Sequence, residues 1–113
     1  MKEHRWVREF PGAVTVCDTD GRIIEMNDRA AEVFEKDGGR TLLGTNALDC
    51  HPEPARTKLK GMLASGRTNV YTIGKSGKKK IVYQSPWYED SRYAGFVEIS
   101  FEIPWDMPHF NRD

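Results

Sequence analysis

Hydrophobic and polar residues near the start of the chain are arranged as two short strands followed by a helix. Residues 13–18 are rich in β-branched side chains, which predicts a strand. The pair Asp20-Gly21 then predicts a tight hairpin turn, and residues 23–26 form the returning strand. Asn27 suits a helix N-cap, because its side-chain oxygen can accept a backbone N–H of the next turn. The apolar face of the short helix that follows consists of Ala30, Ala31, Val33 and Phe34.

A longer helix is predicted in the middle of the chain. Its start is expected at Pro52, since proline fits the first helical position, where its missing N–H costs nothing. His51 then stands at the helix entrance. Gly66 is expected to end the helix as a C-cap. The apolar positions that recur at helical spacing are Ala55, Leu59, Met62 and Leu63.

The last third of the chain changes to the period of a strand. Residues 69–73 and 81–88 predict two strands, joined by a turn in which Lys78, Lys79 and Lys80 form a solvated tip. After the loop "EDSRYA", residues 95–103 predict a third strand. Its alternation separates Phe96, Glu98, Ser100 and Glu102 from Val97, Ile99, Phe101 and Ile103, and the pattern leaves open which set faces inward.

Hairpins at both ends and helices grouped between them predict an α+β fold. We expect a five-stranded antiparallel sheet with the central helices packed on one face. The length of 113 residues matches one small domain. Residues 1–10 are expected to be an N-terminal cap or dimerisation segment, residues 11–103 the domain, and residues 104–113 a C-terminal tail.

The composition argues against several classes of function. Seventeen Lys and Arg balance 17 Asp and Glu, whereas nucleic acid and anionic membranes select a basic excess, so we expect neither as a partner. No apolar run approaches the length of a membrane span and the first residues are charged, which indicates a cytoplasmic location. No phosphate loop, nucleophile–base pair or pair of carboxylates is evident, so we expect no enzyme. Cys17 and Cys50 lack metal-ligand spacing and are interpreted as inert thiols.

The order of these pieces resembles that of a PAS domain. The similarity extends over residues 10–103, and the ordered set carries it, since no single piece is diagnostic. Glu35 departs from the pattern, because a Gly often follows the first helix in this family. The residues that match are Asp18 with Asp20-Gly21 in the first turn, Asn27 before the helix, Gly44 before the longer helix, and the strand "AGFVEIS".

The resemblance implies a sensory or interaction module of signal transduction. PAS domains typically hold a small ligand or cofactor between sheet and helices, often dimerise, and pass a change in packing to an effector. Two functions follow. One is a sensor domain that binds a small molecule, forms a homodimer and acts on an effector domain or a protein in trans, as in two-component systems. The alternative is a ligand-free module for dimerisation or protein interaction.

The resemblance also raises two cofactors. Light-sensing relatives bond flavin through a Cys in a Gly-x-Asn-Cys pattern, and here the matching residues Gly44, Asn46 and Ala47 end in a methyl group, so we do not expect a flavin photoadduct. Haem can be ligated by a histidine, and His51 is the interior candidate. The alternative for His51 is a structural role at the first helical turn. "Cys-His-Pro" at residues 50–52 resembles a motif of some PAS proteins.

A small metabolite is the third option for the pocket. Aromatic side chains with a few polar atoms make a suitable binding wall, although Tyr and Trp on strands are also common in cores and interfaces. Besides His51, the candidate binding residues are Asn46, Arg56, Tyr71, Tyr83 and Trp87, with Gln84 and Tyr88 on the same strands.

Overall fold

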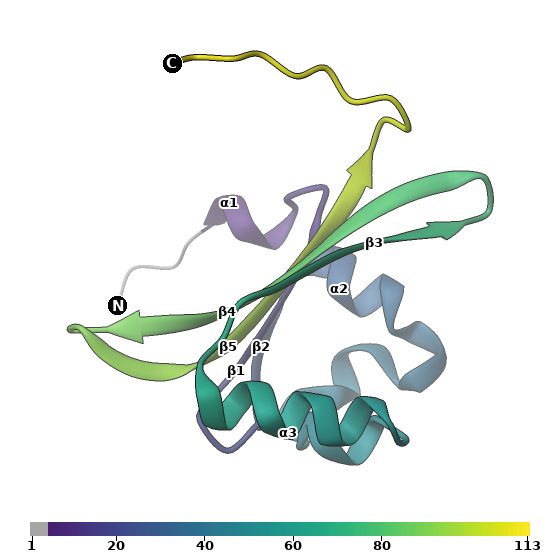
Figure 1. Cartoon of the computed structure of the whole chain (residues 1–113). Helices are drawn as coiled ribbons and strands as arrows, with labels where there is room; N and C mark the ends of the chain where they lie inside the picture. The colour runs from purple at the N-terminus through teal and green to yellow at the C-terminus, as the bar shows by residue number, and fades with distance from the viewer. Residues whose placement is uncertain (1–4) are drawn as a thin grey trace.

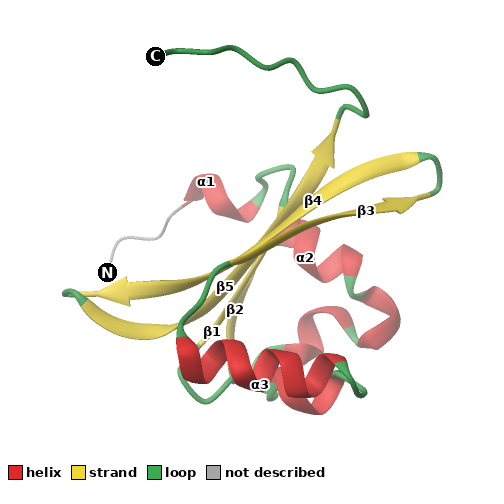
Figure 2. Ribbon diagram, in the orientation of Figure 1, coloured by secondary structure: helices red, strands yellow, loops and turns green. Residues whose placement is uncertain are grey.

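The computed structural model describes residues 5–113, apart from the side chain of Cys50. Five antiparallel strands form one sheet in the order β2-β1-β5-β4-β3. Figures 1 and 2 show α2, the short 3-10 helices and α3 grouped on one side of this sheet. The predicted α+β class, with a five-stranded antiparallel sheet and central helices on one face, is confirmed. The elements are α1 (Arg5–Arg8), β1 (Ala13–Cys17), β2 (Ile23–Met26), α2 (Asp28–Val33), η1 (Glu35–Asp37), η2 (Gly39–Leu42), η3 (Ala47–Cys50), α3 (Ala55–Ser65), β3 (Asn69–Lys75), β4 (Lys78–Glu89) and β5 (Arg92–Ile103).

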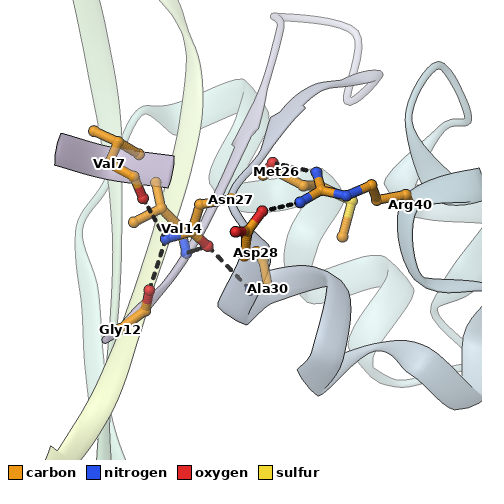
Figure 3. Close-up of polar contacts among 8 residues, drawn as sticks. All are labelled: Val7, Gly12, Val14, Met26, Asn27, Asp28, Ala30 and Arg40. Carbon is orange, nitrogen blue, oxygen red and sulfur yellow. Dashed lines mark hydrogen bonds and ion pairs between the residues drawn. The ribbon is translucent and has the colours of Figure 1, made fainter. Parts of the chain in front are cut away.

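Asn27 joins three elements, as Figure 3 shows. Its side-chain oxygen accepts the backbone N–H of Ala30 at 3.0 Å, which confirms the predicted N-cap of α2, and that of Val14 at 2.9 Å. Its amide nitrogen donates to the carbonyls of Val7 at 2.9 Å and Gly12 at 2.8 Å. Asn27 is only 3% exposed, so these four bonds satisfy a buried amide. One side chain thereby holds α1, β1 and α2 together.

Arg40 on η2 closes the other side of the same corner (Figure 3). Its guanidinium pairs with the carboxylate of Asp28 in the first turn of α2 and donates to the carbonyl of Met26 at 3.3 Å. The 3-10 segment after α2 is therefore tied back to the point where β2 becomes α2.

The longer helix begins later than the sequence predicts. Pro54 is the N-cap and Ala55 the first residue of α3, so the expected start at Pro52 is wrong. Glu53 precedes Pro54, and a residue before proline is disfavoured in the α region, which delays the helix. His51 instead ends η3 as its C-cap. The predicted C-cap of α3 is confirmed: Gly66 is left-handed, with φ 65°, and its N–H donates to the carbonyl of Met62 at 2.9 Å.

Both late hairpins are tighter than predicted. Ser76 and Gly77 both have positive φ, as do Asp90 and Ser91, which is the backbone of two-residue hairpin turns. β4 and β5 consequently begin earlier than expected. The three lysines 78–80 lie in β4, paired with residues 73–75 of β3, so their assignment to a turn is wrong.

The end of β1 passes very close to the start of β5. Gly95 has φ +142°, and a Cβ at this position would collide with the carbonyl of Cys17. Trp87, opposite Gly95 on β4, donates its indole N–H to the same carbonyl at 2.9 Å. The glycine of the "AGFVEIS" strand therefore permits the junction between β1 and β5.

The terminal segments add little to the hydrophobic core. Residues 1–4 of the predicted N-terminal segment lie outside the described residues, and α1 contributes no buried residue. Figure 1 shows α1 away from α3. In the tail, Trp105 donates its indole N–H to the carbonyl of Gly77 at 3.0 Å and so rests on the β3–β4 hairpin.

None of the helices in residues 5–113 is long and apolar enough to cross a membrane. The core is formed by residues of the sheet and the central helices, among them Ile23, Met26, Ala30, Leu42, Leu59, Met62, Leu63 and Phe96.

Candidate functional site

A cavity of about 730 Å³ lies between the sheet and the central helices. We call the sheet face toward these helices the inner face and the opposite one the outer face. Helical and 3-10 segments supply the roof of the cavity, and residues of all five strands supply its floor. The roof includes Phe34, Leu42, Ala47, Leu59 and Met62.

The middle of the floor is a row of polar side chains, which we call the polar row: Thr15, Glu98, Gln84 and Asn69. Strand pairing sets Thr15 opposite Glu98, Glu98 opposite Gln84, and Gln84 opposite Asn69. Asn69 donates its amide N–H to the Gln84 oxygen at 2.8 Å, and Gln84 donates to Glu98 Oε1 at 2.7 Å. All four side chains line the cavity. The row therefore crosses four strands and places hydrogen-bonding groups beneath the helices.

Apolar side chains border the polar row on the inner face. Cys17 and Phe96 are paired on one side of it, and both are buried. On the other side, Val82 on β4 lies between Ser100 and Tyr71. The cavity thus offers a polar strip within largely apolar surroundings, which is the usual composition of a small-molecule site.

The charge of Glu98 affects the neighbouring titratable groups. Burial, together with the negative charges of Glu98 and Asp18, raises the pKa of the Cys17 thiol to about 12. Burial also raises the pKa of the Tyr71 hydroxyl, with a second contribution from Glu98. Both groups are protonated at neutral pH, so Cys17 is a poor nucleophile there.

Two lysines lie at the β3 side of the cavity. The ammonium of Lys58, on α3, is 5.9 Å from the centre of the Tyr71 ring. Lys80 lies on β4 directly opposite Glu102 on β5. Lys58 is exposed and Lys80 half-buried. Lys80 is thus two rows along the sheet from the polar row, and Lys58 lies over Tyr71 in the row between them.

His51 lines the cavity from the end of η3. Its Nδ1 lies 2.5 Å from the carbonyl oxygen of Ala47, so Nδ1 carries the proton and donates to this carbonyl. That bond leaves Nε2 as the nitrogen available to a ligand. The same bond also fulfils the structural role foreseen for His51, although at η3 and not at α3.

His51 suits a haem ligand, but the Glu98 side of the cavity does not suit haem. His51 Nε2 is a suitable axial donor, and a carbonyl partner on the other ring nitrogen is typical of ligating histidines. On the floor, however, a macrocycle would remove water from the Glu98 carboxylate without offering a hydrogen bond in return, which is costly. Ala47, the residue that matches the flavin-bonding cysteine, lies on the wall with an inert methyl group. Within residues 5–113 no cluster of three or more His, Cys, Asp or Glu could hold a metal ion.

The structure brings together some of the predicted binding residues and separates others. His51, Tyr71 and Gln84 line the cavity. Asn46 does not: it caps η3 by accepting the Leu48 N–H at 2.9 Å and donates to the carbonyl of Asp20 at 2.9 Å. Arg56 is exposed on α3 and is absent from the lining, as are Tyr83, Trp87 and Tyr88.

Strand alternation explains which aromatic residues point away. Tyr83 is adjacent in sequence to Gln84, so it lies on the outer face, where it is 43% exposed. Trp87 is engaged with the carbonyl of Cys17. Thr15, Asn69 and Glu98 were not among the predicted binding residues. The alternation of residues 95–103 does group Glu98 with the buried Phe96, and that grouping is the signal by which the sequence could have indicated it.

Comparison with known proteins agrees with this geometry. The family model described as "PAS fold" matches residues 7–68, more than half of the chain. No curated protein shows a significant match. A C-terminal domain from Streptococcus mutans is similar in structure, with a TM-score of 0.71, 20% identity and coverage of 85% of this chain and 78% of that one.

Two further solved structures are similar over most of their length. The PAS domain of BvgS from Bordetella pertussis has a TM-score of 0.64 and 17% identity, with coverage of 88% of this chain and 82% of that one. A sensory box sensor histidine kinase structure from Vibrio cholerae has a TM-score of 0.63 and 13% identity, with coverage of 90% and 89%. The chain belongs to the PAS fold family.

Proposed function

We propose that the chain is a sensory domain of signal transduction whose cavity binds one small organic molecule. The observation that carries this proposal is the cavity of about 730 Å³, with its polar row set in apolar surroundings. A packed core has few voids larger than a water molecule, so a cavity of this size favours a ligand over a sealed core. The similarity to a sensor histidine kinase structure adds support for a signalling role.

Asn27 couples the cavity to α1 through α2. Val33 and Phe34, at the end of α2, line the cavity, and Asn27 caps the start of the same helix. The Asn27 amide also donates to Val7 in α1. A ligand that displaces α2 would therefore alter the support of α1. We propose that α1 passes this change to an effector domain or to a protein in trans.

We also propose that the chain has no catalytic activity of its own. The cavity thiol of Cys17 is protonated at neutral pH, because its pKa is raised to about 12. His51 Nδ1 is engaged with the carbonyl of Ala47. The expectation that Cys50 is inert falls on a side chain outside the described part, and the cytoplasmic location stays a prediction.

The test is native mass spectrometry of the purified chain, alone and after incubation with a collection of small organic molecules. We expect one bound molecule per chain. Ser100→Trp, on the inner face, should fill the cavity and remove the adduct, whereas Ser85→Trp, on β4 next to Gln84 and therefore outward, should leave it unchanged. Adducts that persist in Ser100→Trp, or none in the natural chain, would contradict the proposal. Visible absorbance separates haem and flavin from colourless ligands.

A second function is favoured by the outer face. Val14, Ile99, Tyr83 and Val70 are paired across four strands and form what we call the apolar row. Tyr83 and Val70 are 43% and 48% exposed, so the row leaves hydrophobic surface on the outside. We propose that this face makes the homodimer, alone or together with ligand binding. A chain that is dimeric without any retained molecule would favour the ligand-free interaction module.

A further inference from the structure

The hydrogen bonds of the polar row all run in one direction. The Asn69 amide donates to Gln84, and the Gln84 amide donates in turn to Glu98. Each amide oxygen or carboxylate thus accepts from the strand nearer the edge of the sheet, and the series ends at β5. The row consequently converges on a carboxylate near the centre of the cavity floor.

This carboxylate has no cation beside it. The ion pairs of residues 5–113 are Arg29–Glu32, Arg40–Asp28 and Lys78–Glu102, and none involves Glu98. Gln84 bonds to Oε1, whereas Oε2 accepts no hydrogen bond from the described part of the chain. Glu98 is half-buried, and Phe96 next to it on the inner face is 4% exposed. A carboxylate in such surroundings is costly unless a positive or donating group faces it.

No other charged side chain that lines the cavity pairs with the Glu98 carboxylate. Lys58 is exposed near Tyr71, Lys80 faces Glu102, and Asp37 is exposed. His51 directs Nδ1 to the carbonyl of Ala47. Burial raises the pKa of Cys17 and of Tyr71, and the negative charge of Glu98 is the second cause in both.

We propose that the cavity selects a small organic cation: an apolar or aromatic body that carries one protonated amine, which donates to Glu98 Oε2. The inference rests on the proposed function, because it requires a molecule in the cavity. The apolar part would lie against residues such as Phe96, Leu59 and Met62, which line the cavity around the polar row. A charge-assisted hydrogen bond of this kind is stronger than a neutral one and gives selectivity between matched molecules.

The experiment uses probes that differ only in their polar end. Tryptamine, tryptophol and indole-3-propionate present an ammonium, a hydroxyl and a carboxylate on one indole body, and phenethylamine, 2-phenylethanol and 3-phenylpropionate do the same on a smaller one. Their dissociation constants for the full chain are measured by calorimetry, with amide chemical shifts as the record of where they bind. We expect the amine of a set to bind about tenfold to a hundredfold more tightly than the alcohol, and the carboxylate most weakly.

Glu98→Gln keeps the size of the side chain and removes its charge. In this variant the dissociation constants of the amine and the alcohol of a set should lie within about threefold of each other. Glu102→Gln is the matched control, since it removes the same charge from the same strand at a residue outside the lining, and it should keep the preference for the amine. The comparison of probes on the natural chain needs no variant, so a poorly folded Glu98→Gln would not prevent the test.

The possible outcomes separate the two proposals. Alcohols or carboxylates that bind inside the cavity as tightly as the amines would overturn the selection of a cation and leave the ligand-binding function standing. A preference for amines that survives in Glu98→Gln would overturn the role of Glu98. If neither set shifts any amide around the cavity, this inference is wrong, and the native mass spectrometry above decides the ligand-binding function.

Discussion

The polar row and the apolar row occupy the same four strands, one residue apart, and face opposite ways. Thr15, Glu98, Gln84 and Asn69 point toward the helices, and their sequence neighbours Val14, Ile99, Tyr83 and Val70 point outward. A sheet with one face on a core normally has the reverse distribution, with hydrophobic residues inside and polar residues outside. This difference is the basis of both proposals: a ligand with a polar group at the inner face, and a second copy of the chain at the outer face.

Two phenylalanines on β5 give the clearest contrast between the faces. Phe96 on the inner face is 4% exposed, and Phe101 on the outer face is 40% exposed. We expect Phe96→Ala to lower the free energy of unfolding by about 3–5 kcal/mol, because it removes a buried ring from the core. Phe101→Ala should cost less than about 1 kcal/mol in the monomer. Urea denaturation measures both, and equal losses would contradict the assignment of the two faces.

Two asparagines test whether polar groups on this domain hold the fold or remain available to a ligand. Asn27 is 3% exposed and makes four hydrogen bonds, whereas Asn69 is half-buried and donates one to Gln84. Asn27→Ala should destabilise the chain by about 2–4 kcal/mol, since it leaves buried backbone groups unpaired. Asn69→Ala should cost at most about 1 kcal/mol. Thermal unfolding compares them, and a larger loss for Asn69→Ala would refute this distinction.

A charge on the apolar row should weaken the proposed homodimer. Tyr83→Glu puts a carboxylate among Ile99 and Val70, where a second copy would bury it. We expect the dissociation constant of the dimer to rise at least about tenfold. Ala64→Glu adds the same charge on the exposed side of α3 and should have no effect. Sedimentation measurements decide, and a dimer of equal strength in Tyr83→Glu would place the interface elsewhere.

The smallest effect concerns Cys17, which reports the charge of the inner face. Its pKa of about 12, raised by burial and then by Glu98, makes the thiolate about a thousandfold scarcer below pH 9 than for a thiol with the ordinary value of 9.0. Alkylation should therefore be slow at pH 8 and accelerate as the pH rises toward 12. Glu98→Gln removes a negative charge, so the pKa should fall and alkylation should become a few times faster. Peptide-resolved mass spectrometry follows Cys17, and an unchanged rate would exclude Glu98 as a neighbour of the thiol.

Much of the fold was accessible from local patterns. Asn27 as an N-cap, Gly66 as a C-cap and the hairpin at Asp20-Gly21 depend on neighbouring residues only, and the structure confirms the two caps and places β1 and β2 on either side of that turn. The structure begins α3 later than Pro52 predicts, because Pro54 disfavours the α region at Glu53. The late turns are tighter than predicted, because Ser76-Gly77 and Asp90-Ser91 alone form them. Residues on either side of each turn pair along the strands, and that pairing depends on contacts across the sheet.

The candidate site was less accessible, because it depends on contacts between distant segments. Alternation puts Glu98 and Phe96 on one face of β5, and it puts Tyr83 and Gln84 on opposite faces of β4. Both predictions hold in the structure. Asn46, predicted as a binding residue near the helix, caps η3. Arg56, predicted as a binding residue near the helix, is exposed on α3 and does not line the cavity.

Which residues share a face of a strand follows from the chain alone, since successive side chains point to opposite sides of the backbone. Which face turns toward the helices does not, because that depends on the pairing of β1 with β5 and on where α2 and α3 pack. Those long-range contacts place Glu98 in the cavity and Ile99 outside it. The amino-acid order therefore specified which residues of each strand share a face. Strand pairing and helix packing aligned these residues into two rows, turned one row toward the cavity and left the other on the surface.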